Sequence, residues 1–223
     1  MKKNALAVAA VVAIAILALA SYKIYEINTT RSRVMALLKS ANESLAPALL
    51  AQASAKPVDD IEARVAATES HLAALRGLRT SSIGRLADAA DETLHSTREI
   101  LRRQMAIAHV RARLAQSSEA LSKHIQSDHG AADWTQEAMR LKTTVDKDSR
   151  DYRIAVESYA SLLESFPESQ AKLAPHVDRA LLVDAALLAK ARQHALDAHA
   201  SVDQNVKRIS SLKAYRVGDA RSR

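Results

Sequence analysis

Histidine is the residue type in this sequence that most readily suggests chemistry, because imidazole is the commonest metal ligand in proteins. Eight histidines are present. Two ligands on one helix must be three or four residues apart to face the same ion. His194 and His199 are five residues apart, which turns them about 140° away from each other on a helix. His124 and His129 have the same spacing across an expected helix end, so we expect surface histidines and no metal site.

Motifs for nucleophilic or phosphate chemistry are also missing from the sequence. Four glycines are too few for most glycine-rich phosphate loops and nucleophile elbows. Serine is plentiful, but scattered Ser, His and Asp residues on helices are expected by chance. The sequence therefore predicts a protein that is not an enzyme and that binds no cofactor.

Two groups of basic residues could contact an anionic surface. The first is interspersed with Glu99 and Glu119, so it is typical of a solvated helix face. The second lies near the end of the last expected helix, where cations stabilise the helix dipole. Contact with anionic lipid is the alternative for both groups, whereas nucleic acid is not expected, because no aromatic residues alternate with the basic ones. The candidate contacts are Arg98, Arg102, Arg103, Lys207, Arg208, Lys213 and Arg216.

Three polar residues interrupt the apolar helical repeats, namely Asp148, Asp184 and Asn205. Polar residues at such positions can fix the register of packed helices. They can also line a polar ligand pocket between helices. The sequence leaves both interpretations open.

Helices are the elements that must position these residues. The 223 residues include only four glycines, four prolines and 3% aromatic residues, a composition typical of long helices. Apolar residues recur at spacings of four and three from Trp134 to Phe166 and from Val177 to Leu212. The sequence predicts an all-α protein in which an N-terminal transmembrane or signal helix precedes long antiparallel helices that form an elongated bundle or coiled coil.

Proline and glycine indicate where the chain turns. We expect a first helix to about residue 54, bent near Pro47, and a second over about 58–127. A kink or turn is expected inside 77–84, where glycines and hydroxyl residues weaken the helix. Pro167 is expected to separate a third helix, over about 131–165, from a fourth over about 168–215.

The N-terminal segment has no polar residue from Ala5 to Ala20 and follows two lysines. A bilayer core takes about 20 apolar residues, and Tyr22 and Tyr25 lie where interfacial aromatics belong. We expect a membrane anchor over residues 1–27, a helical bundle over 28–215 and a basic tail over 216–223. The alternative is a signal peptide cleaved after Ala20.

Charge and composition guide the expected location and function. The two N-terminal lysines favour a cytoplasmic N-terminus, which places the body in the periplasm or extracytoplasmic space. The chain has no cysteine and a net charge of +7, so disulfides are excluded. We expect a membrane-anchored cell-envelope protein that acts in protein–protein interaction or scaffolding, as a homo-oligomer or with another envelope protein. The alternative is a helical sensor that binds a small molecule and works with a separate signalling partner.

Overall fold

The computed structural model describes residues 2–54, 60–78, 81–127 and 133–211, with side chains undescribed at 2–13, 81 and 209–211. These ranges contain helices and no strand, which confirms the all-α prediction. The five long helices are α1 (Lys2–Ala53), α2 (Ile61–Gly77), α3 (Gly84–Gln126), α4 (Trp134–Leu173) and α5 (Ala185–Ser211). Three short 3-10 helices lie in the turns: η1 (Ser81–Ile83), η2 (Ala174–His176) and η3 (Arg179–Leu181).

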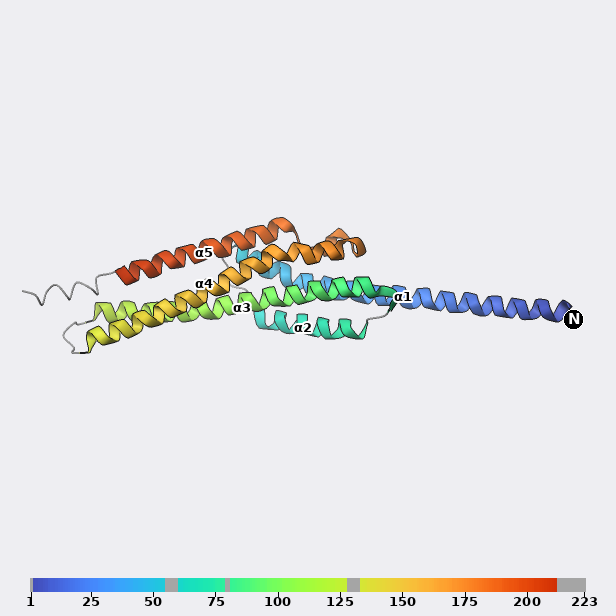
Figure 1. Ribbon diagram of the computed structural model, residues 1–223, viewed down its shortest axis with the longest axis horizontal. Coiled ribbons are helices and arrows are strands. Elements are labelled where there is room, and N and C mark those ends of the chain that lie inside the picture. The colour runs from blue at the N-terminus through green and yellow to red at the C-terminus, as the bar shows by residue number, and fades with distance from the viewer. Residues whose placement is uncertain (1, 55–59, 79–80, 128–132, 212–223) are drawn as a thin grey trace, which may run out of the picture.

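The five helices pack side by side into an elongated bundle, from which the first part of α1 extends at one end (Figure 1). We call this the N-terminal end of the bundle. Helix α2 folds back along α1, where His71 Nε2 lies 2.9 Å from Ser40 Oγ and Arg64 donates to the Ser44 carbonyl at 3.0 Å. Helices α3, α4 and α5 then alternate in direction. The turns before α3 and before α5 therefore both lie at the N-terminal end.

The predicted second helix is in fact two antiparallel helices, α2 and α3. The break falls inside the expected weak segment, since α2 ends at Gly77 and α3 begins at Gly84. The Leu78 N–H donates to the Leu75 carbonyl at 2.9 Å and closes the last turn of α2. The extra reversal changes the direction of the last helix. Four alternating helices would bring the last one back toward the N-terminal end, but with five helices α5 runs away from it.

The prediction that Pro167 separates two helices is wrong. Helix α4 continues through Pro167 to Leu173. Phe166, Ser169 and Leu173 are buried around the proline, and this burial offsets the cost of about 3 kcal/mol for a proline inside a helix. The turn occurs instead between residues 174 and 184, which include Pro175. Helix α1 likewise continues through Pro47.

The apolar repeat predicted between residues 134 and 166 is confirmed. All residues of this repeat are buried except Leu141 and Leu162, which are half-buried. In α2 four residues with the same spacing are likewise buried, namely Val65, Thr68, Leu72 and Leu75. The buried α4 positions of the repeat are Trp134, Ala138, Val145, Asp148, Tyr152, Ala155, Tyr159 and Phe166.

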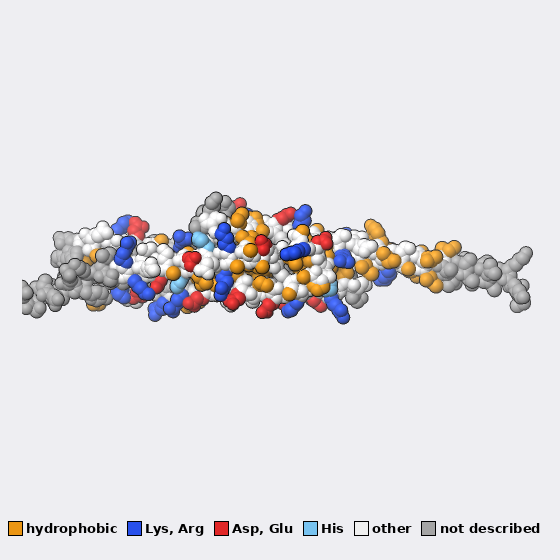
Figure 2. Space-filling model, turned by 90° about the horizontal axis from the view of Figure 1, so that it is seen from above, with side chains coloured by type: hydrophobic (Ala, Val, Ile, Leu, Met, Phe, Trp, Pro, Cys, Tyr) orange, Lys and Arg blue, Asp and Glu red, His pale blue; other side chains and the backbone are white. Residues whose placement is uncertain are grey.

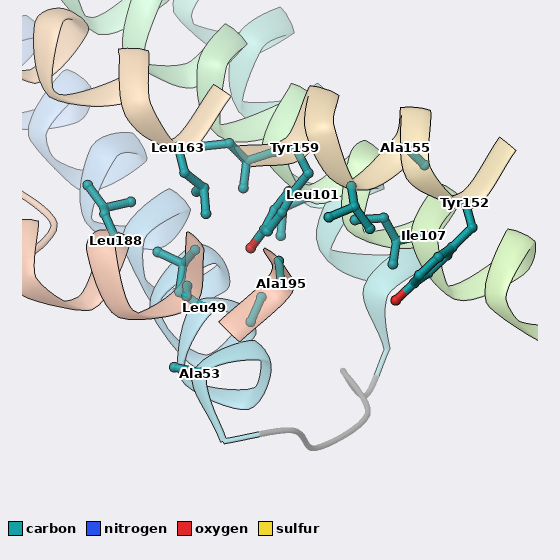
Figure 3. Packing of buried hydrophobic residues seen from close by; sticks show 14 of the residues in the cluster. Leu49, Ala53, Leu101, Ile107, Tyr152, Ala155, Tyr159, Leu163, Leu188 and Ala195 are labelled. Carbon is teal, nitrogen blue, oxygen red and sulfur yellow. The ribbon is translucent and has the colours of Figure 1, made fainter. Parts of the chain in front are cut away.

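Two clusters of buried side chains make up the core. In the larger one, residues of α1, α3, α4 and α5 converge, as Figure 3 shows for Leu49, Leu101, Tyr159 and Leu188. The smaller one lies toward the N-terminal end and joins α1, α2, the first part of α3 and the end of α4. Its largest members are Val34, Leu38, Leu72, Leu75, Ile83, Leu86, Leu94 and Leu173.

The predicted membrane segment can be compared with the structure only in part. The prediction starts at Ala5, and side chains up to residue 13 lie outside the described residues. Among the residues that the structure describes, no helix is long and apolar enough to cross a membrane. The described residues thus do not support the transmembrane part of the predicted fold.

Leu101→Ala should destabilise the bundle, because the leucine is fully buried between four helices. A buried Leu→Ala change costs about 3 kcal/mol, which lowers the Tm of a domain of this size by about 6–12 °C. Circular dichroism melting of the full chain in mild non-ionic detergent measures this change. Leu50→Ala is the control, since Leu50 is 58% exposed, and an equal loss in both variants would contradict the packing described above.

Candidate interaction surfaces

A stretch of exposed apolar side chains covers α1 where it leaves the bundle. The sequence has no polar face here, so every side of the helix is apolar. Figure 2 shows hydrophobic side chains along this stalk, away from the main body. The large hydrophobic side chains are 60–70% exposed, and they are Ile14, Ile16, Leu17, Leu19, Tyr22, Ile24 and Tyr25. We call residues 14–25 the apolar stalk.

A cavity of about 480 Å³ lies directly beside the base of the apolar stalk. Arg31 of α1, Arg85 at the start of α3 and His176 of η2 contribute its basic side chains, and Ser82 also lines it. The Arg31 guanidinium donates to the His176 carbonyl at 3.1 Å. No carboxylate is among the described residues of its wall. We call this space the basal cavity.

A second cavity of about 480 Å³ adjoins the basal cavity, with which it shares Arg31, Pro175 and His176. It is lined by Arg31, His176 and Met35, but also by Asp178. The carboxylate makes this second space less favourable for an anion than the basal cavity. The two cavities share Arg31 as a common wall.

The N-terminal end of the bundle carries an excess of positive charge. Among the described residues, five arginines at this end make no ion pair, and each is exposed. Of the carboxylates nearby, Glu26 is paired with Lys23 at 3.4 Å. The five arginines are Arg31, Arg33, Arg76, Arg85 and Arg179. Sequence reasoning missed this group, because it placed the last turn at Pro167 and left open whether 77–84 is a kink or a turn.

The basic residues named from the sequence lie along α3 and at the end of α5. Arg98 contacts Glu99 at 2.8 Å, and Arg102 pairs with Glu69 of α2. Arg103 is exposed. These side chains lie along the body of the bundle and not at its N-terminal end.

The basic residues of α5 lie at the opposite end of the bundle. Lys207 pairs with Asp203 on its own helix at 2.7 Å, and Arg208 is exposed. Lys213 and Arg216 lie outside the described residues.

The three polar residues that interrupt the apolar repeats do not lie together in the structure. Asp148 is buried, and its Oδ1 lies 3.4 Å from Nε of Arg113, which links α4 to α3. Asp184 is exposed at the start of α5, where its Oδ1 accepts the Ala186 N–H at 2.9 Å. Asn205 is about 30 Å farther along the same helix, at a small apolar cavity of about 150 Å³. A single pocket lined by all three does not exist in this structure.

A buried polar contact that sequence reasoning missed connects three helices. Gln104 of α3 donates from Nε2 to the Ala48 carbonyl of α1 at 3.2 Å and to the Tyr159 hydroxyl of α4 at 2.9 Å. Burial raises the pKa of Tyr159 above its usual value, and the hydrogen bond to Gln104 offsets little of this. The signal in the sequence was the position of Gln104, three residues from both Leu101 and Ile107 on the buried face.

Groups of metal-binding side chains do not occur in the described ranges. No three His, Asp or Glu residues there are placed to hold a metal ion. His124, in the last turn of α3, instead stacks on Trp134 at the start of α4, with ring centroids 5.1 Å apart. His199 stacks on Tyr152 at 6.0 Å.

Comparison with known proteins identifies no relative. The sequence matches no family model, and no curated protein and no solved structure matches it significantly. The function is therefore inferred from the residues of this chain.

Tyr159→Phe should destabilise the bundle, because it removes one of the two hydrogen-bond partners of the buried Gln104 amide. Loss of such a partner costs about 1–3 kcal/mol. Denaturant unfolding of the wild type, Tyr159→Phe, Gln104→Leu and the double variant measures the coupling between the two side chains. Strictly additive effects of the two changes would show that the hydrogen bond contributes nothing.

Proposed function

We propose that this protein is a membrane-anchored helical bundle of the cell envelope that acts in protein–protein interaction or scaffolding. The observation that carries the proposal is the apolar stalk, whose large side chains are 60–70% exposed on all sides of α1. Burying seven such side chains gains on the order of 10 kcal/mol. A helix that is apolar all around is typical of a membrane or a buried core, and the described helices leave this one uncovered.

The length and flanks of the segment support membrane insertion. Ala5 to Tyr25 is 21 residues, which as a helix spans about 30 Å, the thickness of a bilayer core. Lys2 and Lys3 precede it, and Lys23 can extend its amine toward the interface. Tyr22 and Tyr25 lie at the interfacial end, where aromatic rings are enriched.

The proposed location follows from the basic N-terminus. Lys2 and Lys3 favour the cytoplasmic side, so the bundle lies in the periplasm or extracytoplasmic space beside the inner membrane. Cleavage after Ala20 is the alternative, and it would leave a periplasmic bundle that keeps only Ser21 to Tyr25 of the stalk.

A scaffolding role is supported by the continuity and length of the helices. Helix α1 is unbroken from Lys2 to Ala53, so the stalk and the bundle form one rigid rod at their junction. Helices α3 and α4 have 43 and 40 residues, which correspond to about 60 Å each. A second copy or another envelope protein could therefore be held well away from the bilayer surface.

Leu17→Arg combined with Ile14→Arg should release the protein from membranes. Each charge near the centre of a membrane helix costs about 3 kcal/mol, and both side chains are exposed, so the bundle should fold normally. The measurement is the fraction of full chain that remains in the membrane pellet after alkaline carbonate washing.

The matched control places an arginine on the bundle itself, as Leu50→Arg, because Leu50 is 58% exposed. The wild type and this control should stay in the pellet. A wild-type protein that is washed off, with its intact mass showing residues 1–20 retained, would contradict the membrane anchor.

Self-association should raise the mass of the protein in solution with increasing concentration, because a scaffold acts through helix contacts between chains. Light scattering of the full chain in detergent, corrected for bound detergent, measures this mass. The ligand-binding alternative would be favoured by a different result. In that case the protein stays monomeric at all concentrations, associates with no other envelope protein, and has a Tm that rises when a small molecule is added.

A further inference from the structure

We propose that the basal cavity binds the phosphate headgroup of an anionic phospholipid in the membrane that holds the stalk. This inference rests on the proposed membrane anchor and adds a specific lipid site to it. It concerns the side chains of Arg31, Arg85, Ser82 and His176, which line one cavity of about 480 Å³.

The chemistry of the cavity fits a phosphate ester. Two guanidinium groups and a hydroxyl line it, and no carboxylate is among its described wall residues. Guanidinium matches the geometry of phosphate oxygens and remains charged at any physiological pH. Arg31 uses one of its five donors on the His176 carbonyl, so its other donors stay available.

The remaining walls of the cavity fit the less polar part of a lipid. Ile27 and Pro175 line it next to the arginines. Ile27 lies two residues beyond the apolar stalk on the same helix, so the glycerol and the first acyl carbons can lie against it while the phosphate contacts the guanidinium groups. A free inorganic anion would leave these apolar walls uncovered.

The position of the cavity along α1 corresponds to the headgroup layer. Ile27 to Arg31 lie two to six residues beyond Tyr25, which is about 3–9 Å along the helix. The headgroup layer on each side of a bilayer is about 5–8 Å thick. When Tyr25 lies at the edge of the hydrocarbon core, the basal cavity is at the depth of the lipid phosphates.

The cavity is formed before any lipid arrives, because the turn between α4 and α5 is attached to α1. Arg31 donates to the His176 carbonyl, and the Asn42 side-chain amide donates to the Leu181 carbonyl. Ile83 and Leu86 are buried in the core beneath the cavity. A preformed site loses little conformational entropy when the ligand binds.

Charge around the cavity also attracts an anionic surface. Arg33, Arg76 and Arg179 lie at the same end of the bundle, and none has an ion-pair partner among the described residues. Asp178 lines the second cavity and is not among the described wall residues of the basal cavity. The phosphate is therefore expected in the basal cavity and not in the second one.

The test measures the Tm of the full chain in non-ionic detergent micelles that contain either phosphatidylglycerol or phosphatidylcholine. Phosphatidylglycerol should raise the Tm by several degrees at saturation, and phosphatidylcholine, which has no net charge, should leave it unchanged. In the variant Arg31→Gln, Arg85→Gln, the phosphatidylglycerol concentration that gives half of the Tm rise should be about 25-fold higher than in the wild type.

The matched control is Lys147→Gln with Arg150→Gln, which removes the same charge from exposed positions on the body of the bundle. This variant should keep the full response to phosphatidylglycerol. Ser82→Asp provides a second, independent change, since it adds a carboxylate at an exposed wall residue and should likewise weaken the response. Circular dichroism in detergent alone verifies that each variant is folded.

Three outcomes would overturn the proposal. An equal response of the Arg31→Gln, Arg85→Gln variant and its control would show that only net charge matters. An equal response to phosphatidylcholine would show that the site does not select anionic lipid. An equal rise of the Tm with inorganic phosphate alone would identify a soluble anion as the ligand.

The lipid site and the membrane anchor fail in different ways. Loss of the wild type from vesicles during carbonate washing contradicts the anchor itself. A wild type that stays in the vesicles but shows no response to phosphatidylglycerol leaves the anchor intact and contradicts only the basal site.

Discussion

Burial of apolar side chains along the seam between α3 and α4 is the constraint on which the other contacts of the bundle depend. The two helices pack along most of their length, and α1 and α5 add Leu49 and Leu188 to the same core. The Gln104 amide lies within this core and bonds to both Ala48 and Tyr159. A polar group there requires both partners at fixed positions, so it specifies the register of three helices as well as adding to their stability.

The direction of the chain at the N-terminal end follows from where the helices break. Because α2 folds back on α1, the turns that precede α3 and α5 lie together at the base of the stalk. These turns carry Arg85, His176 and Arg179 to the side of Arg31. Basic residues from three distant parts of the sequence thus share the end of the bundle that, in the proposed function, lies next to the bilayer.

Much of the fold could be predicted from residue spacing alone. The repeat from Trp134 to Phe166 indicated the buried face of α4, since side chains three and four residues apart share one side of a helix. The weak segment at 77–84 was predicted to be a kink or a turn, and the sequence did not decide between them, because a kink and a full reversal have the same local composition. Pro167 led to a wrong helix boundary. The sequence reveals the free-energy cost of a proline inside a helix, but it does not reveal that the neighbouring residues are buried.

The sequence by itself determined the helical class, the buried face of α4 and the apolar character of the N-terminal segment. Each of these properties depends on residue type and on periods of three to four residues. Only the tertiary structure decided the number of reversals, the direction of α5 and the meeting of Arg31, Arg85 and His176. These features depend on contacts between residues as far apart as Arg31 and His176, and such contacts form through packing that no local pattern encodes.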